Sequence, residues 1–305
     1  MAKTDGNNVV PATLPPEPDE IRKIEKFWTP ERMESAEPIP MPEIDLANER
    51  NAPPRRNPFG TRTPSVTAPV LPDGHPVHLV SPGFHTEKVQ DMSNYPYSVV
   101  GKLFMRFGER IFSSTGWVIG ERSVFTAGHC VYDRQLGWAN YVLFAAQYDT
   151  GNAIGRWPLG RLATLGGWIN TGHPIYDMGV GISAGNIRPA TGKAGYITNM
   201  GRIRSTIKST GYPAKATATH DFDGKQMWEC DGDYIGLENG VQLMSNNMTD
   251  GASGGPGFYQ QSGTWFVVWV NSFREPSQPN ILRSPYLGVG FTNLTKWMRN
   301  NGGDS

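Results

Sequence analysis

The sequence has few cysteines, no net charge and no long apolar run, and each of these features excludes a class of protein. Only two cysteines, Cys130 and Cys230, occur in 305 residues, so neither a disulfide-rich scaffold nor a cysteine-rich zinc site is expected. The 28 basic residues balance the 28 acidic residues, which gives no electrostatic reason to expect a nucleic acid or an anionic membrane as partner. No apolar stretch approaches the roughly 20 residues of a membrane-spanning helix.

Other common signals are also missing. The sequence contains no nucleotide-binding glycine motif and no metal-ligating histidine spacing, so we expect neither a cofactor nor a metal. Residues 1–8 lack the apolar core of a secretory signal; either a signal has been removed or the protein is cytoplasmic. Cys130 and Cys230 leave two alternatives open, a disulfide between them or two buried free thiols.

Proline is concentrated at the beginning of the chain, where 16 of the 25 prolines lie within residues 1–88. This part has no cysteine and few apolar runs, so it cannot form a core of its own. We interpret residues 1–88 as a largely irregular leader or pro-segment and residues 89–305 as the folded domain. Processing is expected at exposed basic residues, with these candidates: Arg55, Arg56, Arg62 and Lys88.

One short helix is expected within the leader. Asp19 and Glu20 supply an acidic first turn, which favours the start of a helix. Three apolar residues follow at helical spacing, and they would dock on the folded domain: Ile21, Ile24 and Trp28.

From Tyr95 onward, short apolar or β-branched runs alternate with glycine, asparagine and proline breaks. These runs lie at residues 99–105, 116–119, 123–127, 141–146, 180–182, 241–244, 266–270 and 287–291. Strands of this length and spacing are typical of β-barrels. Leu294, Trp297 and Met298 recur at helical spacing and predict a helix near the end of the chain.

Three segments carry residues that work together in hydrolysis. His129 lies in TAGHC at 126–130, Asp177 precedes an apolar run, and Ser253 lies in GASGGP at 251–256. A serine hydroxyl becomes nucleophilic when an imidazole takes its proton and a carboxylate orients that imidazole. The glycines around Ser253 favour a tight turn whose N–H groups point to one place. We therefore expect His129, Asp177 and Ser253 to be catalytic, and the N–H groups of Gly251 and Ser253 to form an oxyanion hole.

These motifs, in the order His, Asp, Ser, resemble those of chymotrypsin-like serine proteases. The sequences YPY at 95–97, GYP at 211–213 and MWE at 227–229 are similar to the bacterial glutamyl-endopeptidase branch. The resemblance implies an all-β fold of two six-stranded antiparallel β-barrels, with the active site in the cleft between them and a C-terminal helix. It also implies a serine endopeptidase that acts on proteins or peptides, is secreted or periplasmic, and is monomeric.

Four residues are expected to shape the substrate pocket: Asn247, Met248, Asp250 and Asn271. In the resembling trypsins an aspartate stands at the position of Asn247, so cleavage after Lys or Arg is not expected. The glutamyl branch has a threonine or serine where Met248 stands, and a histidine on a later strand that residues 265–272 lack. A substrate carboxylate would lose solvation with little compensation, which favours a neutral or apolar side chain before the cleaved bond.

Ala252 departs from the resembling trypsins, in which an aspartate at this position pairs with the amino terminus released by activation. Activation here would instead uncover the cleft or place the new terminus elsewhere. Residues 1–88 would occlude the cleft until an activating protease or a protein partner releases it. The alternative to an enzyme is a non-catalytic homologue that acts as a protein-binding module.

Overall fold

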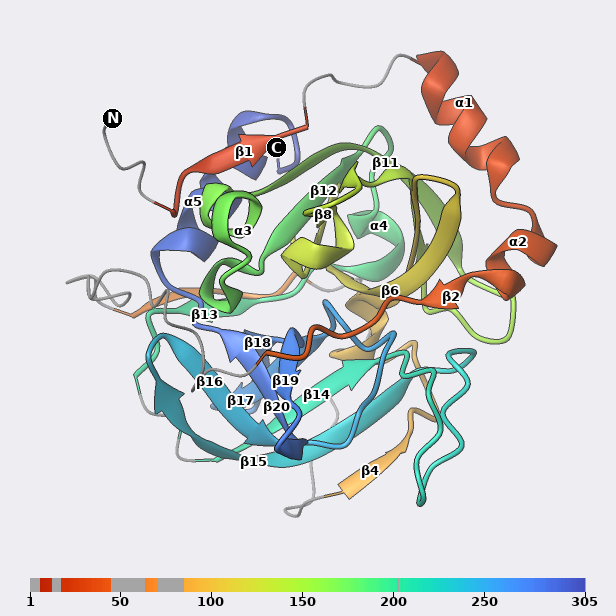
Figure 1. The fold of residues 1–305 in the computed structure, drawn as a ribbon. Helices are drawn as coiled ribbons and strands as arrows, with labels where there is room; N and C mark the ends of the chain where they lie inside the picture. The colour runs from red at the N-terminus through yellow and green to blue at the C-terminus, as the bar shows by residue number, and fades with distance from the viewer. Residues whose placement is uncertain are drawn as a thin grey trace.

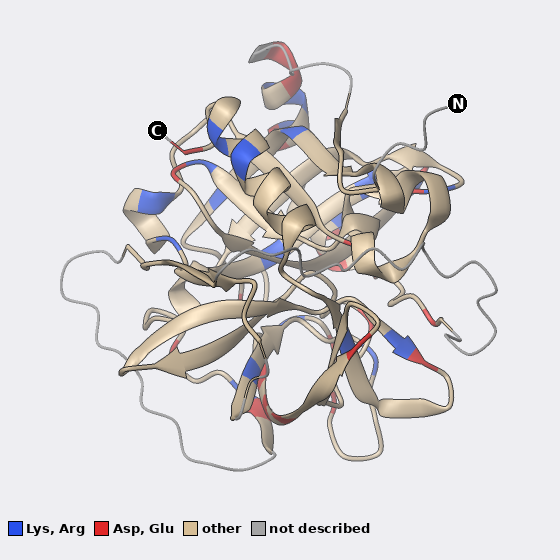
Figure 2. Ribbon diagram, turned by 90° about the vertical axis from the view of Figure 1, so that its left-hand side faces the viewer, with Lys and Arg blue, Asp and Glu red and all other residues tan. Residues whose placement is uncertain are grey.

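A computed structural model describes residues 6–12, 18–44, 64–70, 85–201, 203 and 205–304. Figure 1 shows two β-sheet units, one above the other, with the last helix packed beside the upper unit. Acidic and basic residues are interspersed over both units in Figure 2, with no face dominated by one sign in that view. None of the helices in the described part of the chain is long and apolar enough to cross a membrane.

The first unit is a closed antiparallel barrel of six strands. In order around the barrel these are β5 (Val100–Phe107), β6 (Arg110–Val118), β7 (Ser123–Thr126), β12 (Gly179–Ser183), β11 (Gly155–Leu165) and β10 (Asn140–Ala146). The pairings of β11 with β12 and of β10 with β5 complete the circle. Alternate strand residues such as Leu103, Phe125 and Val180 are fully buried, and they fill the interior as expected for a small barrel.

The second unit is a ten-stranded sheet. Six of its strands run in the order β20 (Gln278–Pro285), β16 (Val241–Ser245), β15 (Trp228–Glu238), β14 (Thr206–Gly211), β17 (Pro256–Gln261) and β18 (Thr264–Val270). The two ends of this run meet, because Val270 N–H donates to Ser284 Oγ at 2.9 Å and Ser272 N–H donates to the Arg283 carbonyl at 3.1 Å. Further strands, β13 (Tyr196–Thr198), β19 (Phe273–Glu275) and two from the leader, extend it beyond the six expected. The predicted all-β class is confirmed.

The helices are few and short. Those after the leader are α3 (Gly166–Thr171), α4 (Arg188–Thr191), α5 (Val289–Asn300) and the 3-10 turns η1 (Tyr97–Val99), η2 (Gly128–Cys130) and η3 (Pro174–Tyr176). A small hairpin joins β8 (Tyr132–Asp133) to β9 (Gly137–Trp138). The predicted C-terminal helix is confirmed as α5, in which Leu294 and Met298 are buried. The strand predicted at 287–291 is wrong: Leu287 lies in a turn and Phe291 in the first turn of α5, because a short apolar run suits a helix as well as a strand.

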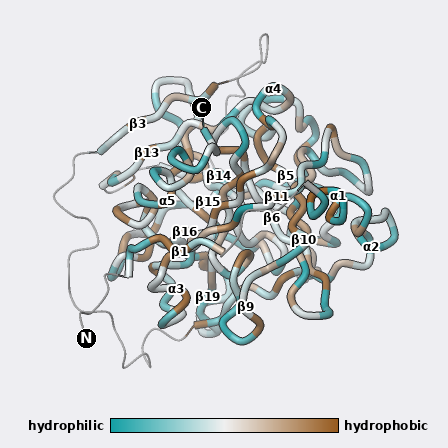
Figure 3. The backbone as a smooth tube through the Cα atoms, turned by 90° about the horizontal axis from the view of Figure 1, so that it is seen from above, coloured by the Kyte–Doolittle hydropathy of each residue, from teal (hydrophilic) through white to brown (hydrophobic). Residues whose placement is uncertain are grey.

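The described parts of the leader pack onto both units. They form β1 (Val9–Pro11), α1 (Pro18–Phe27), α2 (Pro30–Ser35), β2 (Glu37–Pro38), β3 (Ser65–Thr67) and β4 (His85–Lys88). β1 pairs with β11, β2 with β6, β3 with β13 and β4 with β15. Figure 3 shows α1 and α2 at the periphery; α1 packs beside β10 and β11, and α2 beside β6.

The helix predicted in the leader is confirmed as α1. Ile24 in α1 and Trp28 just after it are buried in the core cluster of the first barrel, while Ile21 is half-buried. Among the candidate processing residues, Lys88 is exposed at the end of β4. Arg55, Arg56 and Arg62 lie outside the described residues.

Both cysteines are free and buried. Cys130 belongs to the core of the first barrel and Cys230 to the core of the second sheet. Of the two alternatives that the sequence leaves open, the structure therefore has two separate thiols.

We expect Lys208 to be the residue of the second sheet least tolerant of replacement. Its side chain, 4 % exposed, pairs with Glu229 and lies 3.2 Å from Asp231 Oδ2. Burial raises the pKa of Asp231, and the Lys208 charge opposes that rise. Lys208→Met leaves two buried carboxylates without a cation, which costs about 3–5 kcal/mol in such pairs. Urea unfolding measures this loss, and Lys225→Met, at the exposed pair with Glu34, is the control, with a change within about 1 kcal/mol.

Candidate active site

His129 and Asp177 lie at the same end of the first barrel, in turns that flank two neighbouring strands. His129 is in η2 directly after β7, and Asp177 ends η3 directly before β12. β7 and β12 pair with Thr126 opposite Gly179, so the residues that follow one strand and precede the other must meet. His129 Nδ1 lies 2.8 Å from Asp177 Oδ2, and His129 N–H donates to Asp177 Oδ1 at 2.7 Å.

Two features fix this pair. A Cβ on Gly128 would lie 3.0 Å from both Asp177 Oδ1 and Thr164 Oγ1, so glycine allows the close approach. Burial by itself lowers the pKa of His129, but the Asp177 carboxylate and the Cys130 side chain together raise it more, so the pKa lies well above its usual value. The carboxylate accepts from Nδ1 and therefore leaves Nε2 as the proton acceptor of the neutral ring.

Ser253 is placed by a glycine turn between β16 and β17. Gly251 and Gly254 adopt φ of 89° and 81°, a conformation that favours glycine. A Cβ on Gly254 would lie 2.0 Å from Thr126 Oγ1 and 2.9 Å from Ala127 N, and the Ser253 carbonyl accepts from Thr115 N–H at 2.9 Å. The turn is therefore packed against β6 and the end of β7, close to η2, which contains His129.

The reacting atoms are covered in this structure. Ser253 is fully buried and His129 is 7 % exposed. Neither Ser253 Oγ nor His129 Nε2 has a hydrogen-bond partner in the described part of the chain, so the two are not bonded to each other. Such bonds often tighten only when substrate is bound.

A leader segment crosses between the two units beside the serine turn, drawn in Figure 1 as the red tube that continues from β2. We call residues 37–44 the cleft strap. At its beginning, Ile39 N–H donates to the Ser113 carbonyl at 2.8 Å, and the Ile39 carbonyl accepts from Gly251 N–H at 3.3 Å. The expected oxyanion donor Gly251 is thus engaged by the strap.

The rest of the strap follows the second sheet. Met41 N–H donates to Asp250 Oδ1 at 3.0 Å. Arg274 N–H donates to the Pro42 carbonyl at 3.0 Å, and Ile44 N–H donates to the Arg274 carbonyl at 2.9 Å. The strap therefore uses a backbone edge that an extended peptide can occupy.

The four expected pocket residues have different surroundings. Met248 is fully buried in an apolar cluster that also contains Met41 and Ala252. Asp250 accepts from the strap, as described above. Asn247 Oδ1 accepts from Thr86 Oγ1 at 2.7 Å, and its Nδ2 lies 3.2 Å from His220 Nδ1.

Asn271 supports the serine turn from within. Its Nδ2 donates to the carbonyls of Ala252 and Thr210, both at 3.1 Å. Its Oδ1 accepts from Ser209 Oγ at 2.8 Å and from Trp269 Nε1 at 2.9 Å. The side-chain amide is fully engaged in these bonds, and Asn271 is 0 % exposed.

Sequence reasoning missed the role of Ser272. Ser272 Oγ donates to Asp177 Oδ2 at 2.5 Å. The contact joins residues that are 95 positions apart in the sequence, so no local motif predicts it. Arg274 was also missed: its guanidinium donates to the Asn246 carbonyl at 3.0 Å and to the Met248 carbonyl, and burial lowers its pKa to about 10.

We expect Ser272→Ala to slow hydrolysis by about 10- to 100-fold, since a hydrogen bond to a charged group contributes about 1.5–3 kcal/mol. Asp177 would hold the imidazole less firmly, and kcat would fall more than KM changes. Steady-state kinetics of purified variants measure this split. Ser272→Thr, which keeps a hydroxyl, is the matched control, and equal losses in both variants would contradict the role.

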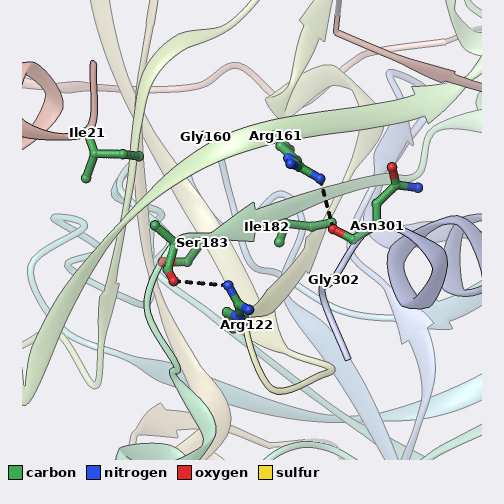
Figure 4. Close-up of a pocket in the computed structure, with 9 residues that line it drawn as sticks. Ile21, Arg122, Gly160, Arg161, Ile182, Ser183, Asn301 and Gly302 are labelled. Atoms are coloured by element: carbon green, nitrogen blue, oxygen red, sulfur yellow. Dashed lines mark hydrogen bonds between the residues drawn. The ribbon is translucent and has the colours of Figure 1, made fainter. Parts of the chain in front are cut away.

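A separate cavity of about 410 Å³ lies beside the first barrel (Figure 4). It is lined by residues of α1, β11 and β12, including Ile21, Arg161 and Ile182, together with Arg122. Arg122 and Arg161 donate to the carbonyls of Ala184 and Asn301. Among the described residues, no group of three His, Cys, Asp or Glu side chains is placed to hold a metal ion.

Two curated proteins are similar to the chain in sequence, although no family profile matches it. A glutamyl endopeptidase of Bacillus licheniformis is 30 % identical over 183 residues, which are 57 % of this chain and 53 % of that protein. An extracellular metalloprotease of Bacillus subtilis is 25 % identical over 139 residues, 43 % of each. The chain thus spans about half the length, or less, of these relatives.

Solved structures match the fold over most of the domain. A thermostable serine protease, AL20, from an extremophilic microorganism has a TM-score of 0.60 at 24 % identity, over 67 % of this chain and 98 % of that one. The protease Anisep of Arthrobacter nicotinovorans has a TM-score of 0.60 at 24 % identity, over 69 % and 97 %. A Glu endopeptidase has a TM-score of 0.58 at 21 % identity, over 72 % and 98 %. The predicted resemblance is confirmed.

Proposed function

Because the chain is related to the glutamyl-endopeptidase branch of chymotrypsin-like serine proteases, we propose that it is a serine endopeptidase that forms an acyl-enzyme on Ser253. One observation carries this proposal. A buried Asp177 carboxylate binds both Nδ1 and the backbone N–H of His129, and the glycine turn with Ser253 packs against the same strands. A carboxylate, an imidazole and a hydroxyl in this arrangement support acyl transfer.

In the proposed reaction, Ser253 Oγ attacks the substrate carbonyl carbon while His129 Nε2 takes the hydroxyl proton. Asp177 stabilises the resulting imidazolium through Nδ1–H. The N–H groups of Gly251 and Ser253 hold the oxyanion, and one such donor contributes about 3 kcal/mol in the transition state. His129 then gives its proton to the departing amine, and water, activated by the same histidine, releases the acyl group.

We propose a neutral or apolar side chain before the cleaved bond. Met248 and Ala252 belong to an apolar cluster that accommodates Met41 of the strap, which supports a pocket for a similar side chain. The Arg274 guanidinium already donates to backbone carbonyls, so it is not available to bind a substrate carboxylate. The buried state of Ser253 supports the view that the chain is a latent precursor. We also propose that the protein acts outside the cell, because the name of the Bacillus subtilis relative describes that relative as extracellular.

Digestion of a mixed peptide library tests the proposal. Mass spectrometry identifies the peptides that a chain with an accessible cleft releases from the library. We expect the C-terminal residues of these peptides to be mainly neutral or apolar, such as Met and Leu. Ser253→Ala in the same background should leave the library intact. Products ending mainly in Lys, Arg or Glu would contradict the proposed pocket. An intact library with the folded chain would instead favour a protein-binding module.

A further inference from the structure

We propose that the cleft strap is a built-in inhibitor that lies in the substrate cleft in the direction opposite to a substrate. This inference rests on the proposed function, because it concerns how the Ser253 site is kept inactive. The strap contacts both units and occupies the N–H of Gly251, the expected oxyanion donor, as shown by the bonds of Ile39 to Ser113 and Gly251. An inhibitor within the chain must also avoid being cut by its own enzyme, and the geometry of the strap explains how it does so.

The direction follows from which residues lie along which unit. Glu37 and Pro38 pair in parallel with Phe112 and Ser113 of β6, in the barrel that carries His129. Glu43, further along, forms a parallel bridge with Arg274 in the second sheet. A peptide bound in the other direction would meet both edges antiparallel.

Proton transfer requires that other direction. His129 must protonate the departing amine, so the residues after a cleaved bond have to extend beside the barrel that carries His129. In the strap, the residues after the Ile39 carbonyl extend along the second sheet instead, toward Arg274. The nitrogen of the Ile39–Pro40 bond therefore lies on the side away from His129. Because that nitrogen receives no proton, it cannot leave, and an intermediate formed by attack on the Ile39 carbonyl returns to the intact peptide bond.

The sequence of the strap, EPIPMPEI at 37–44, suits this role. Proline lacks an N–H and fixes φ, so Pro38, Pro40 and Pro42 restrict the segment to extended conformations before it binds. The intervening N–H groups of Ile39 and Met41, and that of Ile44, all have partners in the cleft. Less entropy is lost on binding when a segment is already extended.

Met41 anchors the strap. Its side chain is 6 % exposed and belongs to the apolar cluster that contains Met248 and Ala252. Its N–H donates a hydrogen bond to Asp250 Oδ1. A carboxylate at position 41 would lie unpaired in an apolar pocket beside Asp250, which strongly disfavours the docked strap.

The first experiment compares hydrolysis of dye-labelled casein by the full chain, by Met41→Asp and by Val66→Asp. Val66 is 53 % exposed in β3 of the leader, so its change adds the same charge outside the cleft. We expect Met41→Asp to be at least about 10- to 100-fold faster than the other two chains, since desolvating an unpaired carboxylate costs at least that factor in docking. Ile44→Pro, which removes the N–H that binds Arg274, is a second way to loosen the strap; circular dichroism verifies folding.

The outcomes separate the two hypotheses. If the wild-type chain is as fast as both strap variants, the strap is no inhibitor, while the proposed function stands. If none of the folded chains hydrolyses casein, the proposed function fails and the inhibitor with it.

A second experiment tests the direction. A capped synthetic peptide of residues 37–44 is added to the Met41→Asp chain and followed by mass spectrometry. We expect competitive inhibition, recovery of the peptide intact, and at least tenfold weaker inhibition by the same peptide with aspartate in place of Met41. Cleavage of the peptide within the period of inhibition would show binding in the substrate direction and would overturn the proposal.

Discussion

Replacing Ser253 with alanine is expected to reduce peptide hydrolysis by about 10⁶-fold, the scale seen when a triad nucleophile is lost. The change removes one oxygen, Ser253 Oγ, which has no hydrogen-bond partner in the described part of the chain. Folding should therefore be almost unaffected, since no bond is broken and only a small cavity forms. The measurement is kcat in the Met41→Asp background, with urea unfolding of the same samples.

A matched control separates chemistry from packing. Ser209→Ala alters another fully buried serine of the second unit, whose hydroxyl bonds to Asn271. It should lower stability by about 1 kcal/mol, the usual net contribution of one hydrogen bond, and leave most of the activity. If Ser253→Ala retained more than a few per cent of the hydrolysis, the nucleophile would be another residue.

Asp177→Asn is expected to lower kcat by about 10⁴-fold, because an amide favours the wrong imidazole tautomer. In the wild-type site the carboxylate accepts from His129 Nδ1 and from His129 N–H. An asparagine that keeps the bond to the backbone N–H presents its NH₂ group to Nδ1, which shifts the ring proton to Nε2. His129 then cannot accept the proton of Ser253.

The same variant has a predictable effect on the pH profile. The base must be neutral, so activity is lost as pH falls through the pKa of His129. Burial lowers that pKa, whereas the Asp177 carboxylate is the largest of the contributions that raise it. Removing the charge therefore moves the acidic limb of the kcat/KM profile to lower pH. A limb that stays in place, or a kcat within tenfold of the wild-type value, would contradict the role of Asp177.

The fold was predictable where strands carry compact apolar runs. Residues 99–105 and 141–146 are such runs, and they became β5 and β10 of the first barrel. β15 was missed because its sequence, WECDGDYIGLE, is interrupted by glycine and acidic residues. Glu229 and Asp231 are buried there beside Lys208 of the neighbouring β14, and such a partner cannot be inferred from the sequence of β15 alone.

The candidate site shows the same division. His129, Asp177 and Ser253 stand in local motifs, and their flanking glycines reveal the turns that place them. No local motif marks Ser272, because its hydrogen bond to Asp177 depends on how the two units dock. The residues that carry out the chemistry can thus be recognised in short local motifs, whereas the residues that position them come from distant parts of the sequence.

The leader was predictable only as a composition. Its prolines indicate that it forms no core of its own, and Ile24 and Trp28 indicate a docked helix, which the structure contains. The path of the cleft strap, by contrast, depends on free backbone edges at Ser113 and Arg274. These edges exist only after both units have folded, so the strap sequence alone could not place it in the cleft.

The most direct test of the account is to label the Met41→Asp chain with a fluorophosphonate and to locate the adduct by peptide mass spectrometry. Such a reagent reacts rapidly only with a serine that an imidazole activates. We expect an adduct on Ser253 that is lost in His129→Ala, with slower labelling of the wild-type chain. An adduct on another residue, or no adduct on a chain shown to be folded, would contradict the assignment of Ser253 as the nucleophile.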